Sequence, residues 1–218
     1  SEKKALEKLC LNYRHFLSKC KTERECVKEI IFQAQRAGYR DLKDIITNKE
    51  TLQAGDKVYS VCMNKSVVLL NIGSEPMENG MNILGAHIDS PRLDIKQNPL
   101  YEDDGLAYMD THYYGGIKKY QWVTVPLAIH GVVAKKDGTI VDINIGEDDN
   151  DPVFCVTDLL IHLAQEQMQK NAAKVIEGEN LDILVGSIPL DGAEKDAVKA
   201  NVLKIVGKKY DIEEEDFL

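Results

Sequence analysis

The first part of the chain has the hydrophobic spacing of two helices. Over residues 2–19, apolar positions recur every three or four residues, which predicts an amphipathic helix with one apolar stripe. Thr22 and Glu25 have the spacing of a capping box, in which each side chain satisfies a backbone donor of the other residue. We therefore expect a second helix to begin at Thr22 and to end at Gly38, because glycine favours a helix stop.

The next segments have the pattern of strands. Residues 57–62 and 66–72 predict a pair of strands joined by a short turn at Asn64 and Lys65. Residues 82–87 are apolar without alternation, as in strands that are covered on both faces of an α/β sheet. This part of the chain is therefore expected to contribute to an α/β sheet.

Beyond Pro91 the pattern becomes mainly β. An alternating segment at 121–148 carries turn residues at Lys136, Asp137 and Gly138, which predicts a hairpin. The later pattern predicts a helix at 157–170, a strand at 181–190, and a helix that is capped by Asp191, runs to about Val206 and stops at Gly207.

The change of pattern places a boundary near residues 91–95. We expect residues 1–92 to form an α/β region and residues 93–218 to form a β-rich region with helices. The fold class predicted for the whole chain is therefore α/β.

Composition limits the partners. The chain has 218 residues, of which 44% are hydrophobic and 29% are charged, an ordinary globular composition that can bury a core. Its net charge is −9 at pH 7, so association with nucleic-acid phosphates or an anionic membrane would begin with repulsion. We expect no nucleic-acid partner and no membrane partner.

Several features of the sequence predict a cytoplasmic protein. No apolar run approaches the ~20 residues that span a bilayer, and the charged N-terminus has no signal-peptide core. The five cysteines are odd in number, widely spaced and without a C-x-x-C pair. They favour neither a disulfide framework nor a thiolate zinc site, so a reducing compartment fits them.

The candidate chemistry lies in the segment ILGAHIDSPRLD, residues 83–94. If the chain stays extended there, the side chains of His87 and Asp89 point to the same side. One ring nitrogen of His87 could then bind a metal, while the carboxylate of Asp89 accepts a hydrogen bond from the other nitrogen and orients the ring. A single H-x-D motif also occurs in loops that bind no metal, so spacing alone leaves an ordinary hydrogen bond as the alternative.

A longer string is more specific than this spacing. GAHIDSPRLDIK resembles the G-A-H-T-D-S-P segment of the aspartyl aminopeptidase and vacuolar aminopeptidase I family of cocatalytic zinc peptidases. YYGGIKKYQW at 113–122 is similar to the family's Tyr-Gly-Gly segment followed by a tryptophan. DLLIHLAQ at 158–165 resembles its Leu-x-Ile-His-Leu helix, and the matched features together span most of the chain.

The resemblance implies a zinc aminopeptidase whose α/β catalytic domain is split in sequence by a β-rich dimerisation domain. Residues 1–92 would be the N-terminal segment of the catalytic domain, and residues 93–218 would be the inserted dimerisation domain, complete or in part. The implied partners are peptide substrates and further copies of the chain, which form dimers and then a dodecamer.

The resemblance also implies roles for three residues. His87 would be a zinc ligand and Asp89 its orienting carboxylate. His162 would reach the active site of the neighbouring subunit and contact the substrate, and its assignment as a second zinc ligand stays open. The predicted helix places His162 on a polar face.

His130, in the alternating segment, is predicted to be a surface residue of a strand.

Other parts of the family's site are expected C-terminal to this sequence: a bridging aspartate, a Glu-Glu pair, another acidic ligand and a last histidine. A catalytic zinc needs about three protein ligands, so the 218 residues alone are expected to be inactive. The full enzyme would hold two Zn²⁺ per active site, although Mn²⁺ or Co²⁺ also suits such ligands. It would remove acidic or neutral N-terminal residues from peptides.

Two alternatives compete with this prediction. The first alternative is a non-catalytic oligomerisation module that retains the aminopeptidase shape, which the missing ligands favour. The second is a lone hydrolytic domain with a complete site of its own, which lacks a visible nucleophile and base.

Overall fold

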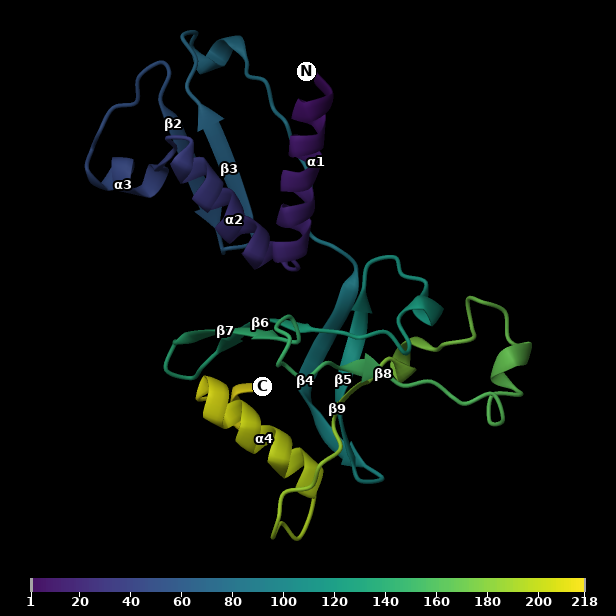
Figure 1. Cartoon of the computed structure of the whole chain (residues 1–218). Coiled ribbons are helices and arrows are strands. Elements are labelled where there is room, and N and C mark those ends of the chain that lie inside the picture. Colours follow the sequence, from purple (N-terminus) through teal and green to yellow (C-terminus); the bar gives the residue numbers. More distant parts are fainter. Residues whose placement is uncertain (1, 218) are drawn as a thin grey trace. The chain divides into compact units, whose positions relative to one another are not determined.

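The computed structural model describes residues 2–217 (Figure 1). The chain divides into two compact units, Ser1–Ser90 and Pro91–Leu218. This division lies at the edge of the region, 91–95, in which the sequence pattern changes. Within the described residues, no helix combines the length and the apolar character that crossing a membrane requires.

The first unit combines helices with a small mixed sheet. Its elements are α1 (Glu2–Lys19), α2 (Glu23–Arg36), β1 (Arg40–Asp41), α3 (Leu42–Thr47), β2 (Lys57–Cys62), β3 (Ser66–Asn71) and the 3-10 turn η1 (Met77–Asn79). The strand order is β1-β2-β3, with β1 parallel and β3 antiparallel to β2.

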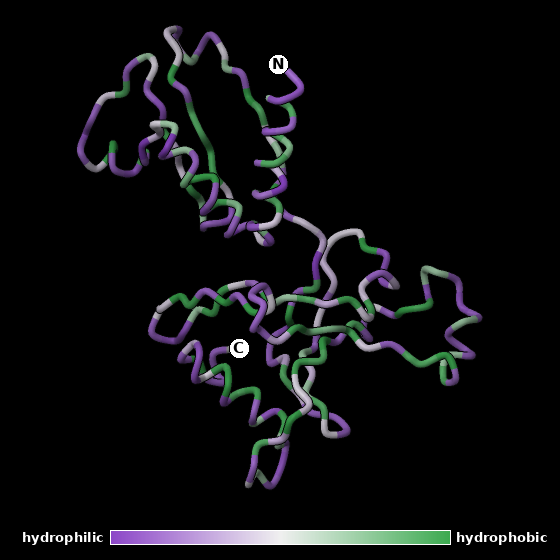
Figure 2. The backbone as a smooth tube through the Cα atoms, viewed as in Figure 1, coloured by the Kyte–Doolittle hydropathy of each residue, from purple (hydrophilic) through white to green (hydrophobic). Residues whose placement is uncertain are grey.

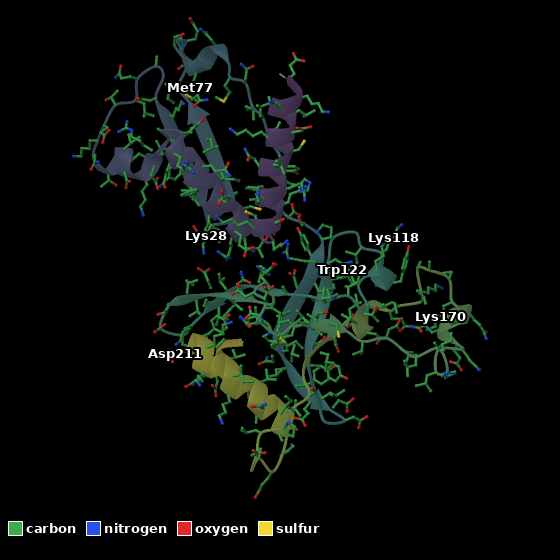
Figure 3. All side chains as sticks on the ribbon, in the orientation of Figure 1. Lys28, Met77, Lys118, Trp122, Lys170 and Asp211 are labelled. Carbon is green, nitrogen blue, oxygen red and sulfur yellow. The ribbon has the colours of Figure 1, made fainter. Side chains whose placement is uncertain are left out.

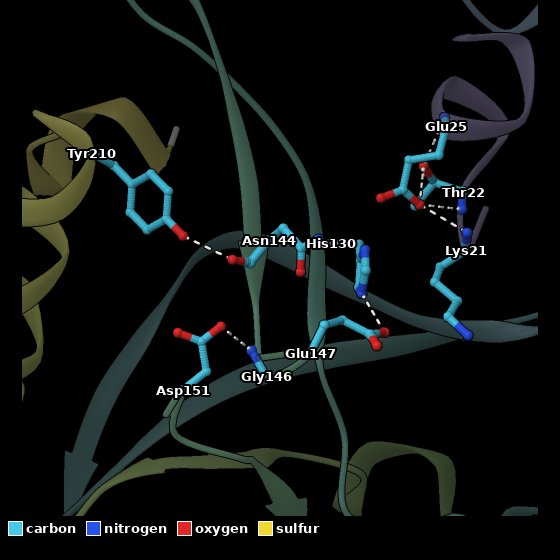
Figure 4. Close-up of polar contacts among 9 residues, drawn as sticks. All are labelled: Lys21, Thr22, Glu25, His130, Asn144, Gly146, Glu147, Asp151 and Tyr210. Atoms are coloured by element: carbon cyan, nitrogen blue, oxygen red, sulfur yellow. Dashed lines mark hydrogen bonds and ion pairs between the residues drawn. The ribbon is translucent and has the colours of Figure 1, made fainter. Parts of the chain in front are cut away.

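Both predicted helices of this unit are confirmed, and so is the capping box of α2. The backbone N–H of Glu25 donates to Thr22 Oγ1 at 3.3 Å, and the N–H of Thr22 donates to Glu25 Oε2 at 3.0 Å (Figure 4). The helix ends at Arg36, and Gly38 just beyond it has a φ of +87°, which glycine adopts without strain. Local chemistry therefore sets both ends of α2.

The core of the first unit lies between α2 and the sheet. Val27 and Ala34 of α2 and Val58 of β2 are buried, and Gln35 Nε2 donates to the Tyr59 hydroxyl at 3.0 Å. By contrast, α1 has no buried residue, although hydrophobic and hydrophilic residues alternate along it (Figure 2). The apolar stripe of α1 is therefore exposed.

The strand predicted at 82–87 is not present. These residues have no regular secondary structure, and the side chains of Ile83 and Leu84 are 79% and 100% exposed. A strand needs a hydrogen-bonded neighbour, and no strand pairs with this segment within residues 2–217. The prediction fails because hydrophobic content alone does not supply a pairing partner.

The second unit is β-rich, as predicted. Its elements are β4 (Arg92–Asp103), β5 (Leu106–Tyr114), η2 (Lys119–Gln121), β6 (Ile129–Ala134), β7 (Ile140–Ile145), β8 (Cys155–Val156), η3 (Gln167–Gln169), η4 (Gly178–Asn180), β9 (Ile183–Gly186), α4 (Ala197–Tyr210) and η5 (Glu214–Phe217). One antiparallel sheet has the order β4-β5-β9-β8, and β6 and β7 form a separate antiparallel pair.

Two hydrophobic clusters hold the second unit together. The first surrounds β8 and β9, and Trp122, labelled in Figure 3, packs against it. The second joins α4 to the strands β4 and β5 through Val198, which is 3% exposed. The buried members of the two clusters are Phe154, Val156, Ile176, Leu181 and Ile183 in the first and Leu100, Ala107, Met109 and Val198 in the second.

The hairpin predicted within 121–148 is confirmed in its second half, as β6 and β7. Its turn is closed by the N–H of Lys135, which donates to the carbonyl of Thr139 at 2.8 Å, and Gly138 has a φ of +87°. The strand predicted at 181–190 is shorter in the structure and consists of β9 alone.

The helix predicted at 157–170 is wrong. The segment forms turns and the short η3, while Leu160, Ile161 and Leu163 are 63% to 72% exposed. A single helix of this length is marginal in water unless its apolar face is buried, and nothing within the described residues covers these side chains. The periodicity therefore indicates a helix only where a partner surface exists.

The last helix begins later than predicted. Asp191 and Gly192 form a turn, and α4 starts at Ala197 and continues through Gly207 to Tyr210. Its first N–H groups are satisfied from another strand, because Glu102 Oε2 accepts hydrogen bonds from Val198 and Lys199, each at 2.9 Å. This cap is 96 positions away from Val198 in sequence, so no local motif reveals it.

Candidate metal site around His87 and Asp89

His87 and Asp89 lie on an irregular segment that follows η1 and precedes β4. The side chain of His87 is 85% exposed and that of Asp89 is 38% exposed. His87 therefore presents its ring to solvent rather than to a core.

The ring of His87 is held by Asp89. Its Nδ1 lies 3.0 Å from the backbone oxygen of Asp89 and 3.2 Å from the carboxylate Oδ1. Both partners are oxygen acceptors, so Nδ1 carries the proton and donates to them. The other ring nitrogen, Nε2, has no protein partner in the part of the chain that the structure describes.

This arrangement fits one metal ligand. A ligating histidine typically binds through one nitrogen while a carboxylate or a backbone carbonyl holds the N–H of the other. Nε2 of His87 is the available donor atom, and Asp89 holds Nδ1 in the way that such a ligand requires. The roles of His87 as a metal ligand and of Asp89 as its orienting carboxylate stay predictions.

The segment does not make a complete metal centre by itself. Among residues 2–217, no group of three or more histidine, cysteine, aspartate or glutamate side chains is placed to hold a metal ion. About three protein ligands are the usual requirement for a catalytic zinc.

A buried cysteine contacts this segment, and the sequence analysis did not identify it. Cys26 of α2 is 6% exposed, and its Sγ lies 3.7 Å from the carbonyl oxygen of Ile88, between His87 and Asp89. The two residues are 62 positions apart, and a lone cysteine in a helix carries no motif. The sequence signal for Cys26 is its position beside Val27 in the predicted helix. The structure buries both side chains.

A second buried thiol lies near Cys26. Cys20, which follows α1, is 8% exposed, and each of the two thiols affects the pKa of the other. Burial raises the pKa of the Cys20 thiol to about 11 and also raises the pKa of Cys26. Both side chains are therefore neutral thiols at neutral pH. All five cysteines of the chain are free.

His162 belongs to the second unit and is exposed on a turn at 161–163, so its predicted place on a polar helix face is wrong. The turn is closed by the N–H of Leu163, which donates to the carbonyl of Leu160 at 2.8 Å. Asp158, four residues before His162, accepts a hydrogen bond from Gln167 Nε2 at 2.8 Å. The predicted roles of His162 in substrate contact or metal binding remain predictions.

His130 differs from its predicted place on the surface. Its side chain is only 8% exposed, and Nε2 lies 3.0 Å from Glu147 Oε1, just beyond the facing strand β7 (Figure 4). The contact joins the two ends of the β6-β7 hairpin. We therefore assign His130 a structural role.

Comparison with known proteins identifies the family. The family described as "Aminopeptidase I zinc metalloprotease (M18)" matches residues 16–218. A Clostridium acetobutylicum protein named "Probable M18 family aminopeptidase 1" is 64% identical over 207 residues, which cover 94% of this chain and 44% of that protein. The chain therefore spans about half the length of the curated relatives that it matches.

Solved structures show the same similarity. The crystal structure of an M18 family aminopeptidase from Thermotoga maritima superposes with a TM-score of 0.91 at 46% identity, covering 99% of this chain and 46% of that one. A structure described as an mApe1 dodecamer from S. cerevisiae matches with a TM-score of 0.66 at 19% identity, covering 96% of this chain and 46% of that one. The first match confirms the predicted α/β architecture, and the second extends the likeness of fold to a distant protein.

Proposed function

Because the chain belongs to the M18 family of aminopeptidase I zinc metalloproteases, we propose that it is part of an aminopeptidase that removes N-terminal residues from peptides. The observation that carries this proposal is the family match over residues 16–218, which includes the His87–Asp89 pair. The sequence resemblance to aspartyl aminopeptidase and vacuolar aminopeptidase I implies the same activity. Residues 1–92 would be the N-terminal segment of the catalytic domain.

In this proposal His87 contributes one zinc ligand and Asp89 orients it. Asp89 keeps the proton of the ring on Nδ1, so that Nε2 presents a lone pair. When bound, zinc supplies polarisation of the scissile carbonyl and a lowered pKa of a water. Two ions per site are proposed from the resemblance, and Mn²⁺ or Co²⁺ would also suit these ligands.

The remaining ligands and the general base are proposed to come from the part of the relatives' length that this chain does not span. The absence of a group of three ligands within residues 2–217 supports this division. It leads to the expectation that the 218-residue chain alone has no peptidase activity.

An activity assay tests the proposal. Two proteins would be compared: the 218-residue chain, and a longer protein that contains this chain and spans the full length of the relatives. Each would be incubated with Zn²⁺, Mn²⁺ or Co²⁺ and a panel of aminoacyl-p-nitroanilides with acidic and neutral residues. We expect turnover by the longer protein alone, and the preferred residue defines the specificity. Turnover by the 218-residue chain would contradict the division of the site, and an inactive longer protein would contradict the aminopeptidase function.

We propose that residues 93–218 mediate self-association. The exposed apolar side chains of the segment 159–163 support this, because a surface of that kind in a soluble protein is usually covered by a partner. The related mApe1 structure is described as a dodecamer, which is consistent with dimers and higher homo-oligomers of the longer protein. Light scattering tests this proposal by measuring the molar mass of the longer protein in solution. A monomer at micromolar concentration would contradict it.

His162 is proposed to contact substrate in the active site of a neighbouring subunit. The supporting observations are the resemblance of residues 158–165 to a family helix and the exposure of His162 within an apolar segment. In the longer protein, His162→Ala should lower turnover while the zinc content stays normal. Loss of zinc in this variant would instead support the assignment of His162 as a ligand.

The second candidate function is a non-catalytic oligomerisation module with the aminopeptidase shape. The incomplete set of metal ligands favours it for the chain as it stands. In either case the net charge of −9 disfavours nucleic acids and anionic membranes as partners, and the five free thiols suit a cytoplasmic location.

A further inference from the structure

The irregular segment that carries His87 and Asp89 is contacted by a buried group of α2. Residues 80–91 take part in no strand pairing, so no sheet hydrogen bonds fix their backbone. The thiol of Cys26 reaches the carbonyl oxygen of Ile88 at 3.7 Å, within the range of an S–H···O hydrogen bond. A residue in the core of the first unit is thereby tied to the peptide between the two predicted functional residues.

The direction of this hydrogen bond follows from the number of protons. Cys26 has one S–H, and the Ile88 carbonyl can only accept, so Cys26 donates to Ile88. A buried thiol of α2 thus holds the backbone at Ile88.

Burial keeps the Cys26 thiol in its donating form. It raises the pKa of this group, so at neutral pH Cys26 retains the proton that it donates.

The position of Ile88 makes the contact relevant to the candidate site. His87 Nδ1 bonds to both the backbone oxygen and the carboxylate of Asp89, so the chain closes a short loop around Ile88. A fixed carbonyl at Ile88 restricts the rotation of its peptide plane and therefore the directions in which His87 and Asp89 project.

We propose that Cys26 is a positioning residue that holds the Ile88 carbonyl and thereby sets the orientation of His87 and Asp89. Its relevance to metal binding rests on the proposed function, but the geometry can be tested on the chain alone. A cysteine that only filled space would act through its volume, whereas a positioning cysteine acts through its S–H donor.

The first experiment compares variants at matched volume in the 218-residue chain. Cys26→Val fills the space of the thiol but has no hydrogen-bond donor. Cys26→Ala removes both the volume and the donor, and Cys26→Ser keeps a donor. Cys62→Ala, at an exposed cysteine of the same unit, is the control. The readouts are the ¹⁵N shifts of the His87 ring and the hydrogen exchange of the amides at 87–89.

We expect the Val and Ala variants to shift the His87 Nδ1 signal toward that of a free imidazole and to speed exchange severalfold. We expect Ser and Cys62→Ala to stay close to the unmodified chain. Equal behaviour of Cys26→Val and Cys26→Ser, or unchanged His87 signals in both Val and Ala variants, would overturn the proposal. If the Ala variant does not fold, the comparison between Cys26→Val and Cys26→Ser still tests whether the S–H donor positions His87.

The second experiment measures Co²⁺ affinity and the visible Co²⁺ spectrum in the longer protein. Changes around a ligand commonly lower metal affinity 10–100-fold, and for Cys26→Val we expect the lower end, about tenfold, with recovery in Cys26→Ser. An unchanged affinity and spectrum in Cys26→Val, where His87→Ala does lower Co²⁺ binding, would overturn the metal part of the proposal. If His87→Ala leaves Co²⁺ binding unchanged, the proposed function fails, and the ring shifts of the first experiment still decide the positioning role.

Discussion

Replacement of Glu102 should destabilise the second unit through the helix α4. Glu102 Oε2 accepts the N–H groups of Val198 and Lys199 at 2.9 Å each, and the N-cap residue Asp196 makes no side-chain cap of its own. Glu102→Ala therefore leaves two N–H groups at the start of α4 without this acceptor.

The expected size follows from the two interactions that are lost. Loss of a capping acceptor costs ~1 kcal/mol, and loss of a negative charge at the positive end of a helix costs a further 0.3–1 kcal/mol or so. We therefore expect Glu102→Ala to lower the free energy of unfolding by ~1–2 kcal/mol. Glu102→Gln keeps an acceptor oxygen and loses the charge, so its cost should be roughly 0.3–1 kcal/mol.

Urea unfolding followed by tryptophan fluorescence measures this effect. The chain has a single tryptophan, Trp122, which packs against the core of the second unit and so reports on that unit. Asp103→Ala, an exposed neighbour in β4, is the control and should change stability by less than ~0.5 kcal/mol. An unchanged stability of Glu102→Ala, or equal losses in the Ala variants of Glu102 and Asp103, would refute this account of the cap.

Three further predictions concern the first unit. Thr22→Ala breaks the capping box of α2 and should cost ~1 kcal/mol, measured by urea unfolding at 222 nm; no loss would contradict the capping role. Because burial raises the pKa of Cys20 from 9.0 to about 11, its contribution to stability is fully present below pH 9 and is lost as the pH rises through about 11. Cys20→Ala should therefore flatten the fall in stability between pH 9 and 11, and an unchanged pH profile would contradict this. In the longer protein, Asp89→Asn should weaken metal affinity about 10–100-fold as measured by competition with a chelating dye, whereas an unchanged affinity would remove Asp89 from its orienting role.

The elements that could be predicted from sequence are those whose signals are local. The capping box of Thr22 and Glu25 satisfies its own donors, and the turn between β6 and β7 is closed by residues within five positions of each other. Such interactions form wherever the short sequence occurs, so the pattern alone is sufficient.

The predictions that failed depend on surfaces far away in sequence. Residues 82–87 and 157–170 have the hydrophobic content of a strand and a helix, but within the described residues neither has a partner that would cover it. The start of α4 also depends on a residue far away in sequence. The carboxylate of Glu102 accepts the first N–H groups of the helix and so selects its first turn.

The candidate site shows the same division. The proximity of His87 and Asp89 follows from a two-residue spacing and is present in the structure. The contact of Cys26 with Ile88 depends on how α2 folds against the irregular segment, and only the three-dimensional structure reveals it. The sequence therefore predicts the pairing of His87 and Asp89, whereas the contact that holds Ile88 is visible only in the structure.

The most direct test of the account is the metal content of the longer protein with and without the imidazole of His87. Zinc per chain would be measured by mass spectrometry after dialysis against metal-free buffer, for the unmodified protein, for His87→Ala and for the control His15→Ala, an exposed histidine of α1. We expect His87→Ala to retain less zinc and to lose aminopeptidase turnover, while His15→Ala retains both. Normal zinc content and normal turnover in His87→Ala would contradict it.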